Sequence, residues 1–126
     1  MERARILYVE DNPGNRLLVK RVLEAEGYVV WEADSGPSAM KLLERETPDL
    51  ILMDVNMPEI DGYTLTAQLR QRDALRRIPI VALTAYALKG DRERALAAGC
   101  AGYIQKPIDV DSLPEQVAAF LRRTPT

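Results

Sequence analysis

Five short apolar runs, separated by longer amphipathic stretches, restrict the fold of this chain more than any other feature of its sequence. The runs do not place a polar residue at every second position, which is the pattern of strands covered on both faces. Five such strands, each followed by a stretch of helix length, predict a parallel sheet with helices on both sides. The runs span residues 6–9, 29–31, 50–53, 80–83 and 102–105.

The stretches between these runs carry the start and stop signals of helices. Asn12 is a suitable cap, Pro13 suits the first helical turn, and Gly27 follows the expected end of that helix. Similar signals predict four more helices, which begin near residues 36, 62, 89 and 111. The first of these runs through Leu42 and Leu43 until Thr47-Pro48 stops it, and the others end near residues 75, 98 and 122.

This order of elements predicts an open, doubly wound α/β fold of the (βα)5 type, in which right-handed crossovers join five parallel strands. The 126 residues are enough for one domain and too few for two. We therefore expect a single domain over residues 1–126, with a core from about residue 5 to residue 121 and no output domain.

The charge balance argues against several classes of function. The chain has 17 basic and 19 acidic residues and a net charge of −2, so no strong field of one sign attracts DNA or an anionic membrane. The one compact basic group, Arg70, Arg72, Arg76 and Arg77, fits a solvated helix face better than a binding patch. The absence of histidine removes the usual zinc ligand and the commonest general base.

Cysteine content and hydropathy indicate the compartment. Cys100 is the only cysteine, which excludes an internal disulfide. The chain shows no secretory signal and no apolar run of membrane-spanning length. We therefore expect a cytoplasmic protein without a membrane partner.

Polar side chains follow four of the five predicted strands. Each has an ordinary explanation of its own, as a helix cap, a turn former or a surface lysine. Ligands of open parallel sheets bind at the carboxyl ends of the strands, so the joint placement favours a site. The residues are Glu10 and Asp11 after the first run, Asp54 after the third, Thr84 after the fourth and Lys106 after the fifth.

Three carboxylates at one sheet edge need a counter-charge. Two carboxylates about 4 Å apart repel by roughly 4 kcal/mol at an effective dielectric constant near 20. A ligand set of oxygens without histidine suits a hard ion such as Mg²⁺. Three carboxylates, one lysine and Mg²⁺ balance to zero, and such a site can receive a phosphoryl group on a carboxylate.

These residues resemble the receiver domains of two-component response regulators. The resemblance extends from about residue 5 to residue 121 and implies the flavodoxin-like strand order 2-1-3-4-5. Four motifs carry it in the expected sequence order: Glu10-Asp11, residues 54–62, Leu83-Thr84-Ala85 and Lys106-Pro107.

The resemblance implies a role for each acidic residue. Asp54 would be the nucleophile that takes a phosphoryl group from a phosphohistidine. Asp11 and Asp54 would bind Mg²⁺ directly, together with the backbone carbonyl of Asn56, and Glu10 would hold the ion through water. We expect that Mn²⁺ can also take this place.

The resemblance likewise implies how the phosphoryl group is held. Lys106 would pair with a phosphoryl oxygen and, at rest, with the Asp54 carboxylate. Thr84 and the backbone amide of Ala85 would bind the other oxygens. Pro107 would follow a cis peptide bond that orients Lys106.

Two further positions are expected to respond to phosphorylation or to limit its lifetime. Tyr103 stands three residues before Lys106, where the family carries a switch aromatic, although core packing is the plain alternative. With Thr84 drawn inward, the Tyr103 ring would rearrange the surface of the fourth helix, fifth strand and fifth helix. Asn56 and Tyr86 flank the site, and we expect the bulky Tyr86 to slow hydrolysis, unless it only decorates the loop.

The implied partners are a sensor histidine kinase or a histidine phosphotransfer protein, an unidentified downstream protein, and a phosphorylation-dependent second copy. The chain would act as a signalling module, either alone or as part of a hybrid histidine kinase, and not as an enzyme on other substrates. A haloacid-dehalogenase-like phosphatase is the alternative enzyme, but it needs an aspartate where this chain has Asn56. A receiver that binds partners without phosphorylation is the remaining alternative.

Overall fold

The structure, a computed structural model, describes residues 3–57, 61–85 and 89–123. Its centre is a five-stranded parallel sheet in the order β2-β1-β3-β4-β5, which confirms the doubly wound, flavodoxin-like fold. The strands are β1 Arg5–Val9, β2 Val29–Ala33, β3 Leu50–Asp54, β4 Ile80–Thr84 and β5 Gly102–Gln105.

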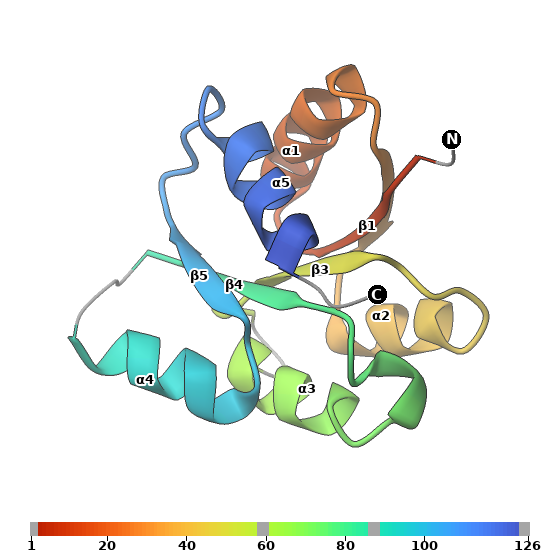
Figure 1. Cartoon of the computed structure of the whole chain (residues 1–126), viewed down its shortest axis with the longest axis vertical. Coiled ribbons are helices and arrows are strands. Elements are labelled where there is room, and N and C mark those ends of the chain that lie inside the picture. The colour runs from red at the N-terminus through yellow and green to blue at the C-terminus, as the bar shows by residue number, and fades with distance from the viewer. Residues whose placement is uncertain (1–2, 58–60, 86–88, 124–126) are drawn as a thin grey trace.

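Helices cover both faces of this sheet (Figure 1). Two of them, α1 and α5, lie on one face, and the other three lie on the opposite face. Alternate residues of each strand point to opposite faces, so the sheet separates two apolar layers. The helices are α1 Pro13–Ala25, α2 Gly36–Leu43, α3 Gly62–Leu69, α4 Lys89–Ala98 and α5 Leu113–Arg123.

The helix ends follow the signals in the sequence. Asn12, Ser35 and Asp61 cap α1, α2 and α3 by accepting a hydrogen bond from the backbone amide three residues on. Such a bond satisfies one of the amides that a first turn leaves without a partner. Gly27 and Gly99 follow α1 and α4 with φ of +93° and +105°, a conformation that glycine adopts without steric cost.

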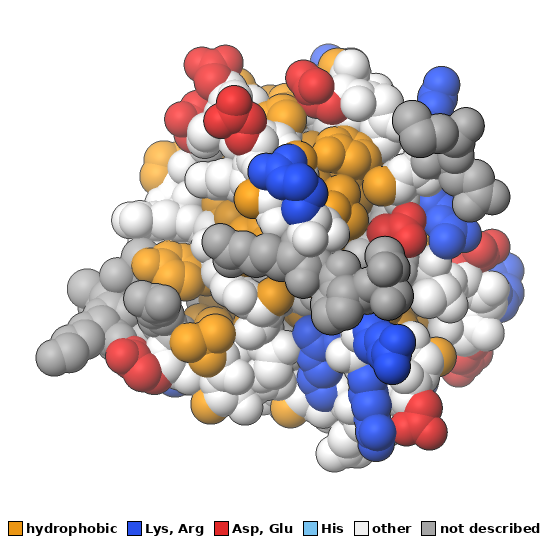
Figure 2. Space-filling model, in the orientation of Figure 1, with side chains coloured by type: hydrophobic (Ala, Val, Ile, Leu, Met, Phe, Trp, Pro, Cys, Tyr) orange, Lys and Arg blue, Asp and Glu red, His pale blue; other side chains and the backbone are white. Residues whose placement is uncertain are grey.

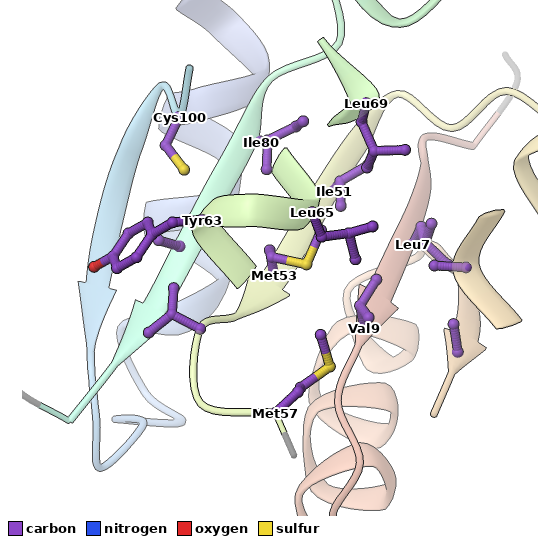
Figure 3. Packing of buried hydrophobic residues seen from close by; sticks show 14 of the residues in the cluster. Leu7, Val9, Ile51, Met53, Met57, Tyr63, Leu65, Leu69, Ile80 and Cys100 are labelled. Carbon is purple, nitrogen blue, oxygen red and sulfur yellow. The ribbon is translucent and has the colours of Figure 1, made fainter. Parts of the chain in front are cut away.

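The larger apolar layer lies between the sheet and helices α2, α3 and α4 (Figure 3). Leu7, Ile51 and Ile80 from three neighbouring strands meet Leu65 and Leu69 of α3 there. The second layer packs α1 and α5 against the other face, where Val19, Leu23 and Val117 lie fully buried. Burial of the strands on both sides explains why their runs in the sequence are continuous.

The third helix is shorter than the sequence predicts. We expected a helix to residue 75, but α3 ends at Leu69 and a separate 3-10 turn, η1, spans Asp73–Leu75. Leu69 and Leu75 are both buried, yet a spacing of six residues does not place two side chains on one side of an α-helix. The chain therefore leaves the helix to bury Leu75.

The surface in Figure 2 carries small groups of both signs, with basic side chains below the sheet near the end of α3 and acidic ones along the upper rim. This mixture agrees with the small net charge. In the described part of the chain, no helix is long and apolar enough to cross a membrane.

Candidate functional site

The carboxyl ends of β1, β3 and β4 bring the predicted residues together. Val9 lies beside Met53, and Asp54 lies beside Leu83. Glu10 continues β1 by one residue, since its backbone amide donates to the carbonyl oxygen of Ala33 at 2.9 Å. Glu10 and Asp54 therefore end two adjacent strands at the same level of the sheet.

Glu10, Asp11 and Asp54 form a compact acidic cluster. Each offers one carboxylate oxygen, and the three oxygens lie within 4.8 Å of one another. Glu10 and Asp54 are almost fully buried, whereas Asp11 is exposed. An all-oxygen cluster that is half buried and half open matches what Mg²⁺ requires, because this ion takes few carboxylates and keeps some of its waters.

Lys106 supplies the cation of the site. Its Nζ lies 3.0 Å from Asp54 Oδ1 and 3.5 Å from Glu10 Oε1. Its backbone amide donates to the carbonyl of Thr84 at 2.7 Å, which ties the end of β5 to β4. The peptide bond between Lys106 and Pro107 is cis.

Two further side chains hold the Glu10 carboxylate, and the sequence reading missed both. The Tyr8 hydroxyl donates to Glu10 Oε1 at 3.2 Å, and Asn15 Nδ2 donates to the same oxygen at 3.1 Å. Tyr8 reads as an ordinary core residue of β1, and Asn15 as an ordinary residue of α1. The available signal was strand alternation, because residues two apart point to the same face.

Arg16 fixes the loop between β1 and α1 from the other side. Its Nη1 donates to the backbone carbonyls of Glu10 at 2.8 Å and Asp11 at 3.0 Å. Its Nε lies 3.9 Å from Glu32 Oε1 on β2. The guanidinium group therefore anchors the backbone that carries two of the three carboxylates.

The two buried carboxyl groups differ in electrostatics. Burial, reinforced by the neighbouring Asp54, raises the pKa of Glu10 to about 7. Burial also works to raise the pKa of Asp54, but hydrogen bonds from Glu10, the Asn56 amide and Lys106 outweigh it and lower that pKa. Without a metal, a proton shared by this pair therefore resides on Glu10, and Asp54 is ionised.

Tyr8 contributes to the same electrostatics as a neutral group. Burial and the nearby charge of Glu10 strongly raise the pKa of its hydroxyl. Near neutral pH, the hydroxyl therefore stays protonated and acts as a hydrogen-bond donor.

The remaining predicted site residues surround Asp54. The Asn56 amide donates to Asp54 Oδ1 at 3.1 Å, and the Asn56 side chain is exposed. Thr84 is buried as the last residue of β4, and Ala85 follows it at the surface. Tyr86 lies outside the described residues.

Tyr103 lies on β5, apart from the carboxylates. It pairs with Ala82 of β4 in register, and its half-buried ring packs against the apolar layer under α3 and α4. Its position therefore fits both packing and the proposed switch.

Gly62 shapes the backbone beside Asp54. A Cβ atom built on Gly62 would lie 2.6 Å from the carbonyl oxygen of Asp54 and 2.7 Å from the Cα of Val55. The amide of Gly62 also donates to the carbonyl of Val55 at 3.2 Å. Only glycine lets the start of α3 come this close to the end of β3.

Residues 6–118 match the response regulator receiver domain family. The polar-differentiation response regulator DivK of Brucella anthropi is 42% identical over 116 residues, which cover 92% of this chain and 94% of that protein.

Solved structures agree with the sequence matches. The receiver domain of a sensor histidine kinase from Pseudomonas aeruginosa, which has a magnesium ion coordinated in its active-site cleft, superposes with a TM-score of 0.86. It is 40% identical, and the match covers 96% of this chain and 99% of that one. The chemotaxis response regulator CheY4 of Vibrio cholerae gives a TM-score of 0.90 at 27% identity, covering 94% of this chain and 99% of that one.

Proposed function

Because the chain belongs to the response regulator receiver domain family, we propose that it accepts a phosphoryl group on Asp54 in an Mg²⁺-dependent reaction. The chain is a receiver domain of two-component systems and so a signalling domain. The observation that carries the proposal is the buried, ionised Asp54 with Lys106 at 3.0 Å beside two further carboxyl groups.

The proposed reaction follows from these groups. A carboxylate oxygen of Asp54 attacks the phosphorus of a phosphohistidine, the P–O bond forms and the P–N bond breaks. The imidazole leaves with the electron pair and takes a proton from solvent. Lys106 stabilises the charge that accumulates on the phosphoryl oxygens, and the amide of Ala85 and the hydroxyl of Thr84 are the further donors.

The acidic cluster would hold the metal. Asp11 and Asp54 are the direct ligands in this proposal, with the Asn56 carbonyl, and Glu10 contributes through water. Mg²⁺ supplies positive charge that offsets both the carboxylates and the incoming phosphoryl group. Mn²⁺ prefers similar oxygen ligands and is expected to substitute.

A phosphoryl group on Asp54 would change the surface at the β5 edge of the sheet. We assign Thr84 and Tyr103 as the two parts of this switch, because Thr84 ends β4 beside the site and Tyr103 lies on the neighbouring strand. The face formed by α4, β5 and α5 would then bind a downstream protein or a second copy of the chain.

The phosphoryl donor in this proposal is a sensor histidine kinase or a histidine phosphotransfer protein. The receiver would form only its own aspartyl phosphate and hydrolyse it, without turning over another substrate. A phosphatase of the haloacid dehalogenase kind has no support, because position 56 holds an amide and the chain belongs to another family.

The test is intact mass after incubation with phosphoramidate and Mg²⁺. We expect one phosphoryl adduct on the wild-type chain and none on Asp54→Asn. When EDTA is present from the start in place of Mg²⁺, we expect no adduct to form on the wild-type chain. Asp34→Asn is the matched control, since Asp34 also directly follows a strand but is exposed. An adduct that persists in Asp54→Asn would place the phosphorylated residue elsewhere.

A further inference from the structure

A tyrosine hydroxyl lies within the apolar layer beneath the site. Tyr8 is fully buried in the middle of β1, among residues such as Ile6, Leu52 and Leu83. Burying a hydroxyl among apolar side chains costs free energy unless it finds a partner. Its partner is Glu10, whose Oε1 lies 3.2 Å away.

The contact follows from strand geometry. Tyr8 and Glu10 are two residues apart on an extended segment, so both point toward α1 and α5. The tyrosine ring spans the distance between them and brings its hydroxyl to the carboxylate from the interior side. Phenylalanine would fill the same volume, so the hydroxyl is the part of this side chain that acts on the site.

The two oxygens of Glu10 have different surroundings. Oε1 is close to three donors: Asn15 Nδ2 at 3.1 Å, the Tyr8 hydroxyl at 3.2 Å and Lys106 Nζ at 3.5 Å. Oε2 lies 3.5 Å from the backbone amide of Asn12, at the limit of a hydrogen bond. The carboxylate is therefore held through Oε1, and Oε2 lies toward the loop that carries Asp11.

We propose that Tyr8 is a positioning residue that gives the site its preference for Mg²⁺ over Ca²⁺, an inference that rests on the proposed Mg²⁺-dependent function. Because Oε1 already accepts from its donors, Glu10 has only Oε2 to offer to a cation or to a water bound to that cation. Tyr8 sets this limit from within the fold, where solvent does not compete for its hydroxyl.

Restricting Glu10 to one oxygen discriminates between Mg²⁺ and Ca²⁺ because the two ions prefer different numbers of protein oxygen ligands. Mg²⁺ keeps several waters and takes about one or two carboxylates, whereas Ca²⁺ accepts about six to eight oxygens and often both oxygens of a carboxylate. A Glu10 restricted to one oxygen suits Mg²⁺ and denies Ca²⁺ a bidentate ligand. Hydrogen bonds behind a ligand commonly tune metal affinity in this way.

The test compares Mg²⁺ and Ca²⁺ dissociation constants, measured by calorimetry, for wild type, Tyr8→Phe and the control Tyr28→Phe. Tyr28 packs half-buried against the same apolar layer and is not part of the acidic cluster. We expect Tyr8→Phe to weaken Mg²⁺ binding by about tenfold. Ca²⁺ binding should stay equal or become tighter, so that the preference for Mg²⁺ falls, and the control should match wild type.

The outcomes separate this inference from the proposed function. Wild-type protein that binds no Mg²⁺ would overturn the proposed metal dependence and this inference with it. A wild type that binds Mg²⁺ and gives the Asp54 adduct, with an unchanged ratio of the two constants in Tyr8→Phe, would overturn the inference alone. An equal loss of affinity for both ions would also overturn it, because it would mean a merely structural effect.

Asn15→Ala provides a second approach should Tyr8→Phe fold poorly. Asn15 donates to the same Oε1 from the surface end of the contact, so its loss should lower the preference for Mg²⁺ in the same direction. If both variants fold, the double variant should show a change in the ratio that differs from the product of the single changes. A ratio unaffected by Asn15→Ala would contradict the role assigned to Oε1.

Discussion

The neighbours of two carboxyl groups in one cluster, Glu10 and Asp54, shift the pKa values of these groups in opposite directions. Both are buried, but Asp54 has Lys106 at 3.0 Å and the Asn56 amide at 3.1 Å. Lys106 is farther from Glu10, at 3.5 Å. The lysine therefore stabilises the charge of Asp54 in preference to that of Glu10.

This arrangement predicts an unusual pH dependence of the metal-free protein. The pKa of Glu10 is raised to about 7 in the folded state, against about 4.3 for a free glutamate. The folded state holds the proton more tightly, so this contribution to stability is fully present below about pH 4.3 and is lost as pH rises to about 7. Glu10→Gln, which mimics the protonated form, should flatten this dependence.

The measurement is urea unfolding of both proteins in EDTA at pH 5 and pH 8. At pH 8, we expect Glu10→Gln to be more stable than wild type by on the order of 1–3 kcal/mol, and at pH 5 the difference should be small. Glu24→Gln is a control, since Glu24 is exposed near the end of α1. A constant difference between wild type and Glu10→Gln at both pH values would argue against protonation of Glu10.

The sequence predicted which charged residues meet at the site, but not the side chains that hydrogen-bond to them. Asp54, Thr84 and Lys106 stand at strand ends, and parallel strands bring those ends together whatever the details of packing. The contacts of Tyr8 and Asn15 depend on side-chain direction and helix placement. Neither follows from residue type, so these supports required the structure.

At the scale of elements, Arg70 holds the segment that follows α3 in place. Its Nη1 donates to the carbonyls of Leu75 at 2.8 Å and Ile78 at 2.6 Å, and its Nε donates to the carbonyl of Gly99 at 2.8 Å. The prediction of a solvated arginine was therefore wrong for Arg70, although Arg76 and Arg77 are exposed. Composition cannot distinguish an arginine that binds backbone carbonyls from one that faces solvent.

We expect Arg70→Met to lower the free energy of unfolding by about 2–3 kcal/mol, because charged hydrogen bonds to several half-buried carbonyls are lost. Arg70→Lys should recover only part of this loss, since an ammonium group lacks the planar fork of the guanidinium. Arg77→Met should lie within about 0.5 kcal/mol of wild type. Urea unfolding monitored by circular dichroism measures all three variants. Equal losses of unfolding free energy in Arg70→Met and Arg77→Met would refute this role of Arg70.

The cap of α3 makes a separate prediction at this scale. Asp61 accepts hydrogen bonds from the Thr64 amide at 2.9 Å and the Thr64 hydroxyl at 3.0 Å. The hydrogen bond from the amide is the main cause of the lowered pKa of Asp61. Asp61→Ala should cost about 1 kcal/mol at pH 7. Asp61→Asn should cost less.

The pH dependence of stability shows whether the charge of Asp61 or its packing stabilises the start of α3. Because the folded-state pKa is lowered, the stabilisation by the carboxylate is present above the usual pKa and is lost as pH falls through the lowered value. The gap between wild type and Asp61→Ala, measured by thermal unfolding, should therefore shrink at acid pH. A gap that is equal at pH 7 and at acid pH would point to lost packing and not to the charge.

At the scale of the whole molecule, the sheet separates two apolar layers, and the site lies at the carboxyl ends of its strands. Glu10 and Tyr8 face α1 and α5, whereas Tyr103 packs on the side of α3 and α4. The alternation of strands and helices predicted this division, because crossovers of one hand place helices on both faces. The single-domain boundary over residues 1–126 stays a prediction, and the family match covers residues 6–118.

In the proposed switch, a signal from Asp54 to the α4–β5–α5 face would cross from β3 through β4 to β5. Asp54 pairs with Leu83, and Thr84 pairs with Gln105, so adjacent strands connect the site to β5 within two steps. The backbone of Lys106 is also bound to Thr84 at 2.7 Å. In the proposed switch, a shift at Thr84 would therefore reach β5 through both the strand pairing and Lys106.

We expect Tyr103→Ala to leave formation of the Asp54 adduct unchanged and to reduce the response of α4 and β5 to it. The reason is position: Tyr103 contacts the layer under α3 and α4, while Asp54 and Lys106 keep their own contacts. Hydrogen exchange of these two elements, with and without phosphoramidate and Mg²⁺, measures the response. The wild type should change its protection on phosphorylation and Tyr103→Ala should change less, with Tyr28→Ala as the control for loss of a half-buried ring. An identical change in Tyr103→Ala and wild type would make Tyr103 a packing residue and move the switch to another part of the β4–β5 edge.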